Sequence, residues 1–115
     1  MIAKRHRFHG HNSVRNVRGR PLVFSSFRVF SSKRPNNKPY RMAVVVSKKV
    51  HKSAVVRNRI RRRLYEAVRV GGLVDAAPVD MVFVVQSTDV ATVPAEELQK
   101  MVWSACEKVR KLHSS

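Results

Sequence analysis

The spacing of hydrophobic and polar residues divides this chain into short strands and two longer helices. Residues 22–30 are rich in aromatic and β-branched side chains, and residues 40–47 carry a central run of apolar residues, so both segments are predicted to be strands. The intervening residues 31–39 are dense in Ser, Asn and Pro, which is typical of an exposed loop and suggests that the two strands are antiparallel neighbours. A continuous apolar run over residues 81–85 predicts a strand that is covered on both faces.

A helical period runs over residues 53–70. Its apolar residues recur at i, i+4, i+8, i+11 and i+12, which places them on one stripe of an α-helix. They are Val56, Ile60, Leu64, Ala67 and Val68. Gly71 and Gly72 follow, at the position where helices commonly end. The stripe predicts a helix that packs one side on the sheet.

A second amphipathic helix is predicted to begin near Thr92. Thr92 is the expected N-cap, and Glu96 and Glu97 fall in the first turn, where negative charge suits the helix dipole. At the other end of the chain, we expect a basic, flexible arm over residues 1–12 and a short helix that ends before Gly19.

The order of these elements predicts an α+β fold. A short helix, two or three strands, a basic helix, a strand and a final helix would form a single-domain two-layer sandwich of one sheet and packed helices. A length of 115 residues suits one domain, residues 1–115. No apolar run approaches the roughly 18–20 residues that cross a bilayer, and no apolar segment follows the basic N-terminus, so we expect a cytoplasmic protein.

Positive charge is concentrated in the first part of the chain. Lys and Arg number 24 against 7 Asp and Glu, a net charge of +17, and residues 1–69 contain 20 of these bases but one acid, Glu66. Self-repulsion at this density opposes compaction, and a polyanion would relieve it. Membrane-binding basic helices usually carry bulky Trp, Phe or Leu on the apolar face, whereas the stripe over 53–70 is mostly small and β-branched. Nucleic acid is therefore favoured over a membrane, and no small-molecule substrate is expected.

The helix predicted over residues 53–70 contains five arginines within seven residues. A turn of about 100° per residue sorts them into faces. The flank beside the apolar stripe contains Arg57, Asn58, Arg61 and Tyr65, and the outer face with the other flank contains Arg59, Arg62 and Arg63. A solvated helix face usually interleaves Glu with its basic residues. Glu66 is the single acid of this helix, which favours a binding surface over a face that only aids solubility.

A second basic group precedes this helix, in the turn that follows the predicted strand. It comprises Ser47, Lys48, Lys49 and Lys52. Free amides at a helix N-terminus bind phosphate, and arginine forks bind phosphate oxygens in pairs. The turn is therefore a predicted phosphate site.

Phe24 and Phe27 are the candidates for stacking on single-stranded bases. Core packing is the competing interpretation for both. Because they lie three residues apart, an undistorted strand would point them to opposite faces, so at most one would meet RNA. The histidines within residues 6–11 have no neighbouring Cys or acid, so no metal site is predicted in the protein, and Cys106 is expected to be a packing residue.

The basic segment resembles a known family. The sequence SKK at residues 47–49, followed by RNRIRRR at residues 57–63, is similar to the signature of the bacterial ribonuclease P protein component, which has an S-K-K element and an R-N-R-I-K-R-like helix. Individual residues match the family motif from about Arg41 to Arg69. In the rest of the chain, the predicted elements match in their order. The resemblance implies the order α-β-β-β-α-β-α, with a left-handed crossover around the R-N-R helix.

The same resemblance implies a function. The family's protein binds a large catalytic RNA and the 5′ leader of precursor tRNA, and the RNA subunit performs the magnesium-dependent hydrolysis that matures the tRNA 5′ end. This chain would be an accessory subunit, monomeric in the complex, with no cofactor of its own and with Mg2+ in the assembled RNA–protein enzyme. The leader would lie in a cleft between the R-N-R helix and the sheet. Carried over by position, Arg57, Asn58 and Arg61 would line the leader side, and Arg59 and Arg62 would belong to the RNA-subunit side.

The sequence departs from the family pattern at several positions. Tyr65 lies where many members have a base, so stacking would replace charge there, and His51 lies where Gly is common. The segment before Gly19 has no aromatic pair, which leaves Phe8, Phe24 and Phe27 as the candidate stacking residues.

Other classes of protein share part of this pattern. A structural ribosomal protein, or another RNA-binding protein without a role in cleavage, would also combine a high pI with a small α+β core. The concentrated R-N-R helix and its S-K-K turn favour the ribonuclease P interpretation over these two classes. A helix-turn-helix DNA-binding module is disfavoured by the strand content, and an autonomous protein nuclease by the lack of a carboxylate pair in the basic half.

Overall fold

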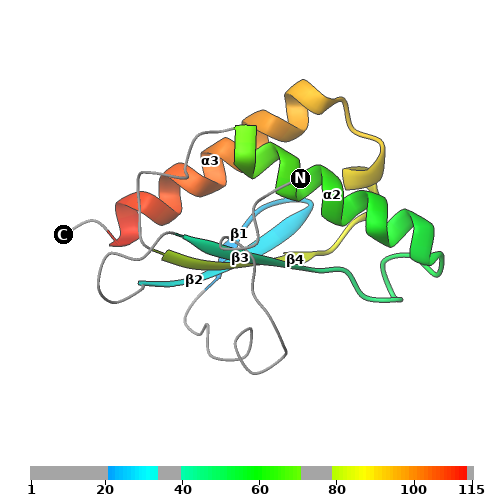
Figure 1. Cartoon of the computed structure of the whole chain (residues 1–115), viewed down its shortest axis with the longest axis horizontal. Coiled ribbons are helices and arrows are strands. Elements are labelled where there is room, and N and C mark those ends of the chain that lie inside the picture. Colours follow the sequence, from blue (N-terminus) through cyan, green and yellow to red (C-terminus); the bar gives the residue numbers. More distant parts are fainter. Residues whose placement is uncertain (1–20, 34–39, 71–78, 114–115) are drawn as a thin grey trace.

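The computed structural model describes residues 21–33, 40–70 and 79–113, and it has a four-stranded sheet with two helices on one face (Figure 1). The strands are β1 (Leu22–Val23), β2 (Phe27–Lys33), β3 (Arg41–Val45) and β4 (Val79–Val85). The helices are α2 (Ala54–Val70) and α3 (Ala95–His113), and a 3-10 turn, η4 (Thr88–Ala91), precedes α3. This is the predicted α+β two-layer arrangement. The expected N-terminal arm, the short first helix and the Gly71-Gly72 stop lie outside the described residues.

The sheet has the order β1-β2-β4-β3, so β2 and β3 are not neighbours. β4 lies between them, antiparallel to β2 and parallel to β3. The expectation that residues 22–30 and 40–47 pair with each other was therefore wrong. β4 is almost continuously apolar and buried, and such a strand loses least by taking the centre of a sheet. The hand of the β3–α2–β4 crossover stays a prediction from the resemblance.

The segment predicted as one strand over residues 22–30 is two strands joined by a tight turn. The Phe24 N–H donates to the Phe27 carbonyl at 2.9 Å, and Leu22 pairs with Val29 across the turn. The buried Ser26 hydroxyl donates to the Asp89 carboxylate at 2.9 Å and ties the turn to η4. The turn also brings the Phe24 and Phe27 rings together, with centroids 5.4 Å apart, instead of on opposite faces.

The core lies between the helices and the helix-facing side of the sheet. The predicted stripe of α2 is confirmed, because Ile60, Leu64, Ala67 and Val68 are all buried. They pack in one cluster with strand residues such as Met81. In the part of the chain that is described, no helix is long and apolar enough to pass through a membrane.

Helix α3 begins at Ala95, and Thr92 is not its N-cap. The Thr92 N–H instead donates to the Asp89 carbonyl at 3.0 Å, which ends η4. The Pro94 carbonyl accepts the first helical hydrogen bond, from Leu98 at 3.0 Å. The Ser-x-Asp pattern at the end of β4 was the missed signal, because the Ser87 hydroxyl accepts the Asp89 N–H and starts a separate turn.

Candidate nucleic-acid interface

The N-terminus of α2 is capped by Ser53 and has no acidic residue in its first turn. The Ser53 hydroxyl accepts the Val56 N–H at 3.4 Å, and its carbonyl accepts the Arg57 N–H at 3.1 Å. The predicted phosphate turn lies immediately before it, and all of its polar members are exposed: Ser47, Lys48, Lys49 and Lys52. The positive end of the helix dipole is thus surrounded by cations, which is the electrostatic arrangement of an anion site.

Arg57 shapes this turn. One guanidinium nitrogen donates to the carbonyls of His51 and Lys52, at 3.0 and 2.8 Å. The His51 Nδ1 in turn accepts the Ser53 N–H at 3.0 Å. Part of the Arg57 fork is therefore already used within the protein, and the turn is held against the helix before any ligand arrives.

Asn58, Arg61 and Tyr65 lie along one flank of α2, as predicted. Arg61 donates to the Asn58 side-chain oxygen at 2.7 Å in an exposed contact. The half-buried Tyr65 packs against the main core cluster. The flank therefore offers a cation and an aromatic ring side by side.

Arg63 does not belong to the outward surface, contrary to the prediction. Its guanidinium donates to the Val90 carbonyl in η4 at 2.6 Å and to the Val93 carbonyl in the connection from η4 to α3. The helical wheel could not reveal this, because the connection comes from a segment 27 to 30 residues away in the sequence. Arg63 is an anchor for the start of α3.

Arg59 and Arg62 are exposed and make no hydrogen bond or ion pair with any other residue of the described ranges. The single acid of the helix, Glu66, is paired with Arg69 at i+3, and this hydrogen-bonded pair lowers the pKa of Glu66 and raises that of Arg69. Glu66 therefore does not neutralise Arg59 or Arg62. These two cations can reach phosphates without breaking a contact among the described residues.

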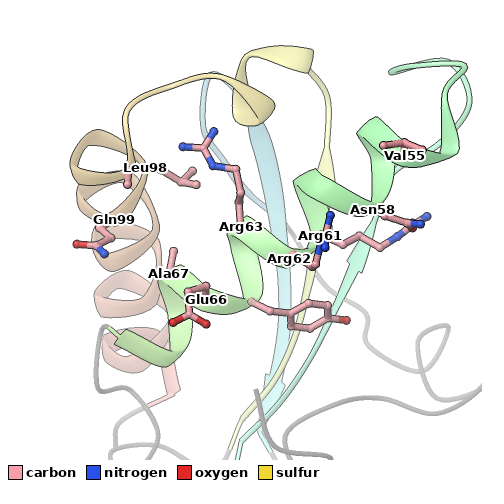
Figure 2. Close-up of a pocket in the computed structure, with 11 residues that line it drawn as sticks. Val55, Asn58, Arg61, Arg62, Arg63, Glu66, Ala67, Leu98 and Gln99 are labelled. Carbon is pink, nitrogen blue, oxygen red and sulfur yellow. The ribbon is translucent and has the colours of Figure 1, made fainter. Parts of the chain in front are cut away.

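A groove of about 780 Å³ lies over α2 and reaches the start of α3 (Figure 2). Its lining crosses the outer surface of α2, from Tyr65 on one flank to Ala67 on the other, and it reaches Leu98 and Gln99 of α3. None of its described lining residues comes from a strand, so this groove differs from the cleft that was expected between the helix and the sheet. The apolar stripe of α2 packs in one core cluster with strand residues, and the cleft beside it for the leader stays a prediction from the resemblance.

The prediction that Phe27 stacks on a base is wrong, and Phe24 is only partly available for such a contact. Phe27 is fully buried and packs on Phe83 with ring centroids 5.4 Å apart, so it is a core residue with no face for a base. Phe24 is half-buried, and the Lys108 ammonium lies 5.2 Å from its ring centroid. A cation–π contact within the protein thus already occupies part of Phe24.

Phe30 is the aromatic residue that sequence reasoning missed. It lies on the sheet face opposite the helices, where it packs beside Ala43 and Val82, and the Arg28 guanidinium lies 5.8 Å from its ring centroid. On the same face, Arg41 forms a bidentate pair with Asp80 at 2.9 and 3.0 Å, which raises the pKa of Arg41. The signal was strand alternation: a strand that starts at Phe27 places Phe30 on the other face.

Cys106 is a buried residue of the main core cluster. Burial raises the pKa of the Cys106 thiol to about 12, so it stays protonated, as expected of a packing residue. Within residues 21–33, 40–70 and 79–113, no group of three or more His, Cys, Asp or Glu is arranged to hold a metal ion. The histidines of residues 6–11 lie outside those ranges.

The chain is similar to a known family and to solved structures. The model of the family described as Ribonuclease P matches residues 2–110. The RNase P protein of Staphylococcus aureus has a TM-score of 0.70 at 20% identity and covers 95% of each chain. The RNase P protein of Thermotoga maritima has a TM-score of 0.64 at 20% identity, covering 84% of this chain and 86% of its own. At these identities the structural matches show a shared fold. Among curated proteins, none matches.

Proposed function

Because this chain belongs to the ribonuclease P protein family, we propose that it is the subunit that binds both the enzyme's catalytic RNA and the 5′ leader of precursor tRNA. The observation that carries the proposal is the pair Arg59 and Arg62, exposed and without partners among the described residues, on a helix with no acid in its first turn. Such cations bind phosphate without first breaking an internal contact.

The arrangement of α2 supports a division between two RNA partners. Arg59 and Arg62 on the outer surface, with the phosphate turn before the helix, would bind the RNA subunit. Arg57, Asn58, Arg61 and Tyr65 would line the leader side. In place of Phe27, the half-buried Phe30 would stack on a base of the RNA partner at the sheet face opposite the helices, apart from the leader flank of α2.

Catalysis is assigned to the RNA. Mg2+ would there activate water and stabilise the leaving oxygen, and the described part of this chain supplies no cluster of ligands that suits it. The protein would contribute affinity and neutralise phosphates. In the proposal it acts as a monomer within the complex, as one domain over residues 1–115, in the cytoplasm.

Reconstitution tests the proposal. We expect the full chain, added to a ribonuclease P RNA at low magnesium, to increase the rate of 5′ maturation of precursor tRNA, and the protein without RNA to leave precursor tRNA uncut. The increase is expected because neutralised phosphates need fewer bound cations. A structural ribosomal protein would bind RNA without accelerating cleavage. Failure to accelerate at any magnesium concentration would contradict the proposal, and cleavage by protein alone would contradict the division of labour.

A further inference from the structure

The turn that connects β3 to α2 is fixed at both of its ends. On the strand side, the Val50 N–H donates to the Ser47 carbonyl at 3.0 Å, and the half-buried Val50 packs against the main core cluster. On the helix side, Nη1 of Arg57 donates to the His51 carbonyl at 3.0 Å and to the Lys52 carbonyl at 2.8 Å. Nη1 carries two hydrogens, one for each carbonyl. The backbone of the turn is therefore tied to the core at one end and to α2 at the other.

The lysine side chains of this turn are free of such contacts. Lys48, Lys49 and Lys52 are exposed, and none of their ammonium groups forms a hydrogen bond or ion pair with another residue of the described ranges. Three like charges in one short turn repel one another, so only the backbone can keep them together. A backbone that is already ordered loses less entropy when a ligand binds. The order of the turn therefore bears directly on how well these lysines bind phosphate.

Arg57 differs from the other arginines near the start of α2. Arg59 and Arg62 are exposed, and Arg61 makes only an exposed contact with the Asn58 side chain. Arg57 is half-buried, and its Nη1 is shared by two backbone carbonyls. A phosphate that took this nitrogen would leave both carbonyls without their donor, which offsets part of the gain from the new contact. The contacts of Arg57 thus favour a role within the protein over a direct contact with RNA.

We infer that Arg57 is a positioning residue of the RNA interface. It holds the backbone of residues 51–52 so that Lys48, Lys49 and Lys52 meet the phosphates of the RNA subunit together. This inference rests on the proposed function and changes one of its assignments, because Arg57 leaves the leader flank and supports the phosphate turn. Its effect on binding then passes through the three lysines.

A double-mutant cycle tests the inference, with affinity for a ribonuclease P RNA as the readout. The triple-alanine variant Lys48→Ala, Lys49→Ala and Lys52→Ala removes the ammonium groups but keeps the carbonyls that Arg57 binds. We expect the loss of affinity from these three substitutions to be at least about threefold smaller when Arg57→Ala is already present. The reason is that a released turn no longer presents its lysines to phosphate.

Arg62→Ala is the matched control for Arg57→Ala in this cycle. It also removes one arginine of α2, but it breaks no contact among the described residues. Its loss of affinity should add to that of the triple-alanine variant, because Arg62 and the turn bind phosphates independently. Additive losses for Arg57→Ala as well would overturn the inference.

Two further readouts separate positioning from a direct contact and from a role in stability alone. Arg57→Ala should reduce the magnitude of the salt slope for the RNA subunit by more than about 0.9, the share of one phosphate contact. At protein concentrations that saturate the RNA subunit, it should leave the ratio of affinities for precursor and mature tRNA unchanged. An unchanged slope, or a selective loss for precursor tRNA, would overturn the inference.

A spectroscopic measurement on the unsubstituted full chain covers the case in which Arg57→Ala fails to fold. The guanidinium signals of the 15N-labelled protein are followed while a short RNA hairpin is added. We expect the Arg57 signals to keep their shifts, because Nη1 stays on the two carbonyls, and those of Arg59 and Arg62 to move. A shift of Arg57 as large as that of Arg62 would overturn the inference. Failure of the unsubstituted protein to bind RNA would instead count against the proposed function.

Discussion

Helices α2 and α3 lie on the same face of the sheet, and each buries one apolar stripe in the same core (Figure 1). Their charged surfaces differ. α3 has Glu96 and Glu97 in its first turn and an ion pair at 2.7 Å between Glu107 and Arg110. α2 has six arginines, one glutamate and no acid in its first turn.

The difference separates charges that stabilise a helix from charges that are free to bind. In α3, acids at the N-terminus and an i,i+3 pair follow the helix dipole and side-chain spacing. In α2, cations lie near the positive end of the dipole, which opposes helix formation and is relieved by a polyanion. Arg57 and Arg63 are used to hold neighbouring segments, whereas Arg59 and Arg62 are left exposed.

If α2 and α3 differ only in their charged surfaces, their apolar stripes should stabilise the fold equally. Leu64→Ala in α2 and Leu98→Ala in α3 each remove a buried leucine. Each is expected to lower the free energy of unfolding by about 2–5 kcal/mol, because a lost leucine leaves a cavity. Urea denaturation of the two variants measures this. If only one variant has a lower free energy of unfolding, the leucine of the other helix contributes little to the stability of the core.

Removal of exposed cations should weaken RNA binding more when they come from α2 than when they come from α3. The double substitution Arg59→Ala with Arg62→Ala is expected to weaken binding of the RNA subunit by about tenfold or more at low salt, and to reduce the magnitude of the salt slope by about 1.4–1.8. Lys100→Ala with Lys111→Ala, which removes two exposed cations from α3, is the control and should change the slope less. Binding isotherms at several salt concentrations measure the salt slope of each variant. Equal slopes for the two variants would contradict the proposal that Arg59 and Arg62 bind the RNA subunit.

Charge reversal on the leader flank should distinguish two substrates. Arg61→Glu is expected to weaken binding of precursor tRNA by about fivefold, which corresponds to the loss of one exposed charge contact. Binding of mature tRNA should weaken less, because mature tRNA has no leader. Arg110→Glu in α3 should affect both tRNAs alike. Affinities of the reconstituted complex for the two tRNAs are the measurement, and equal losses from Arg61→Glu would reject the leader assignment.

The smallest effect concerns the helix dipole. Ala54→Glu places the missing acid in the first turn of α2 and is expected to stabilise the protein by about 0.3–1 kcal/mol relative to Ala54→Gln. The same change should weaken RNA binding, because the new carboxylate lies beside the phosphate turn. Thermal unfolding and RNA affinity of the two variants are compared. If Glu and Gln are equally stable, the first turn of α2 is not electrostatically unfavourable.

Sequence reasoning located α2 to within one residue of its start, and it predicted its stripe, because both depend on a period within one segment. It did not predict the features that depend on contacts between distant segments of the chain. The Ser25-Ser26 turn that separates β1 from β2 is held by Asp89, and the register with β4 decides that Phe30 lies beside Val82. The helical wheel grouped Arg63 with Arg59 and Arg62, although a connection far along the chain accepts its hydrogen bonds.

The amino-acid sequence alone predicts the basic helix, its buried stripe, the excess of positive charge and the family motif, because periodicity and charge are properties of neighbouring residues. The packing of distant segments sets the position of β4 between β2 and β3. It also distinguishes the arginine that anchors a neighbouring segment from those without a partner among the described residues. The physical reason is that a guanidinium binds whichever acceptors lie within reach, and for Arg63 those acceptors are brought close only by the packing of α3 beside α2.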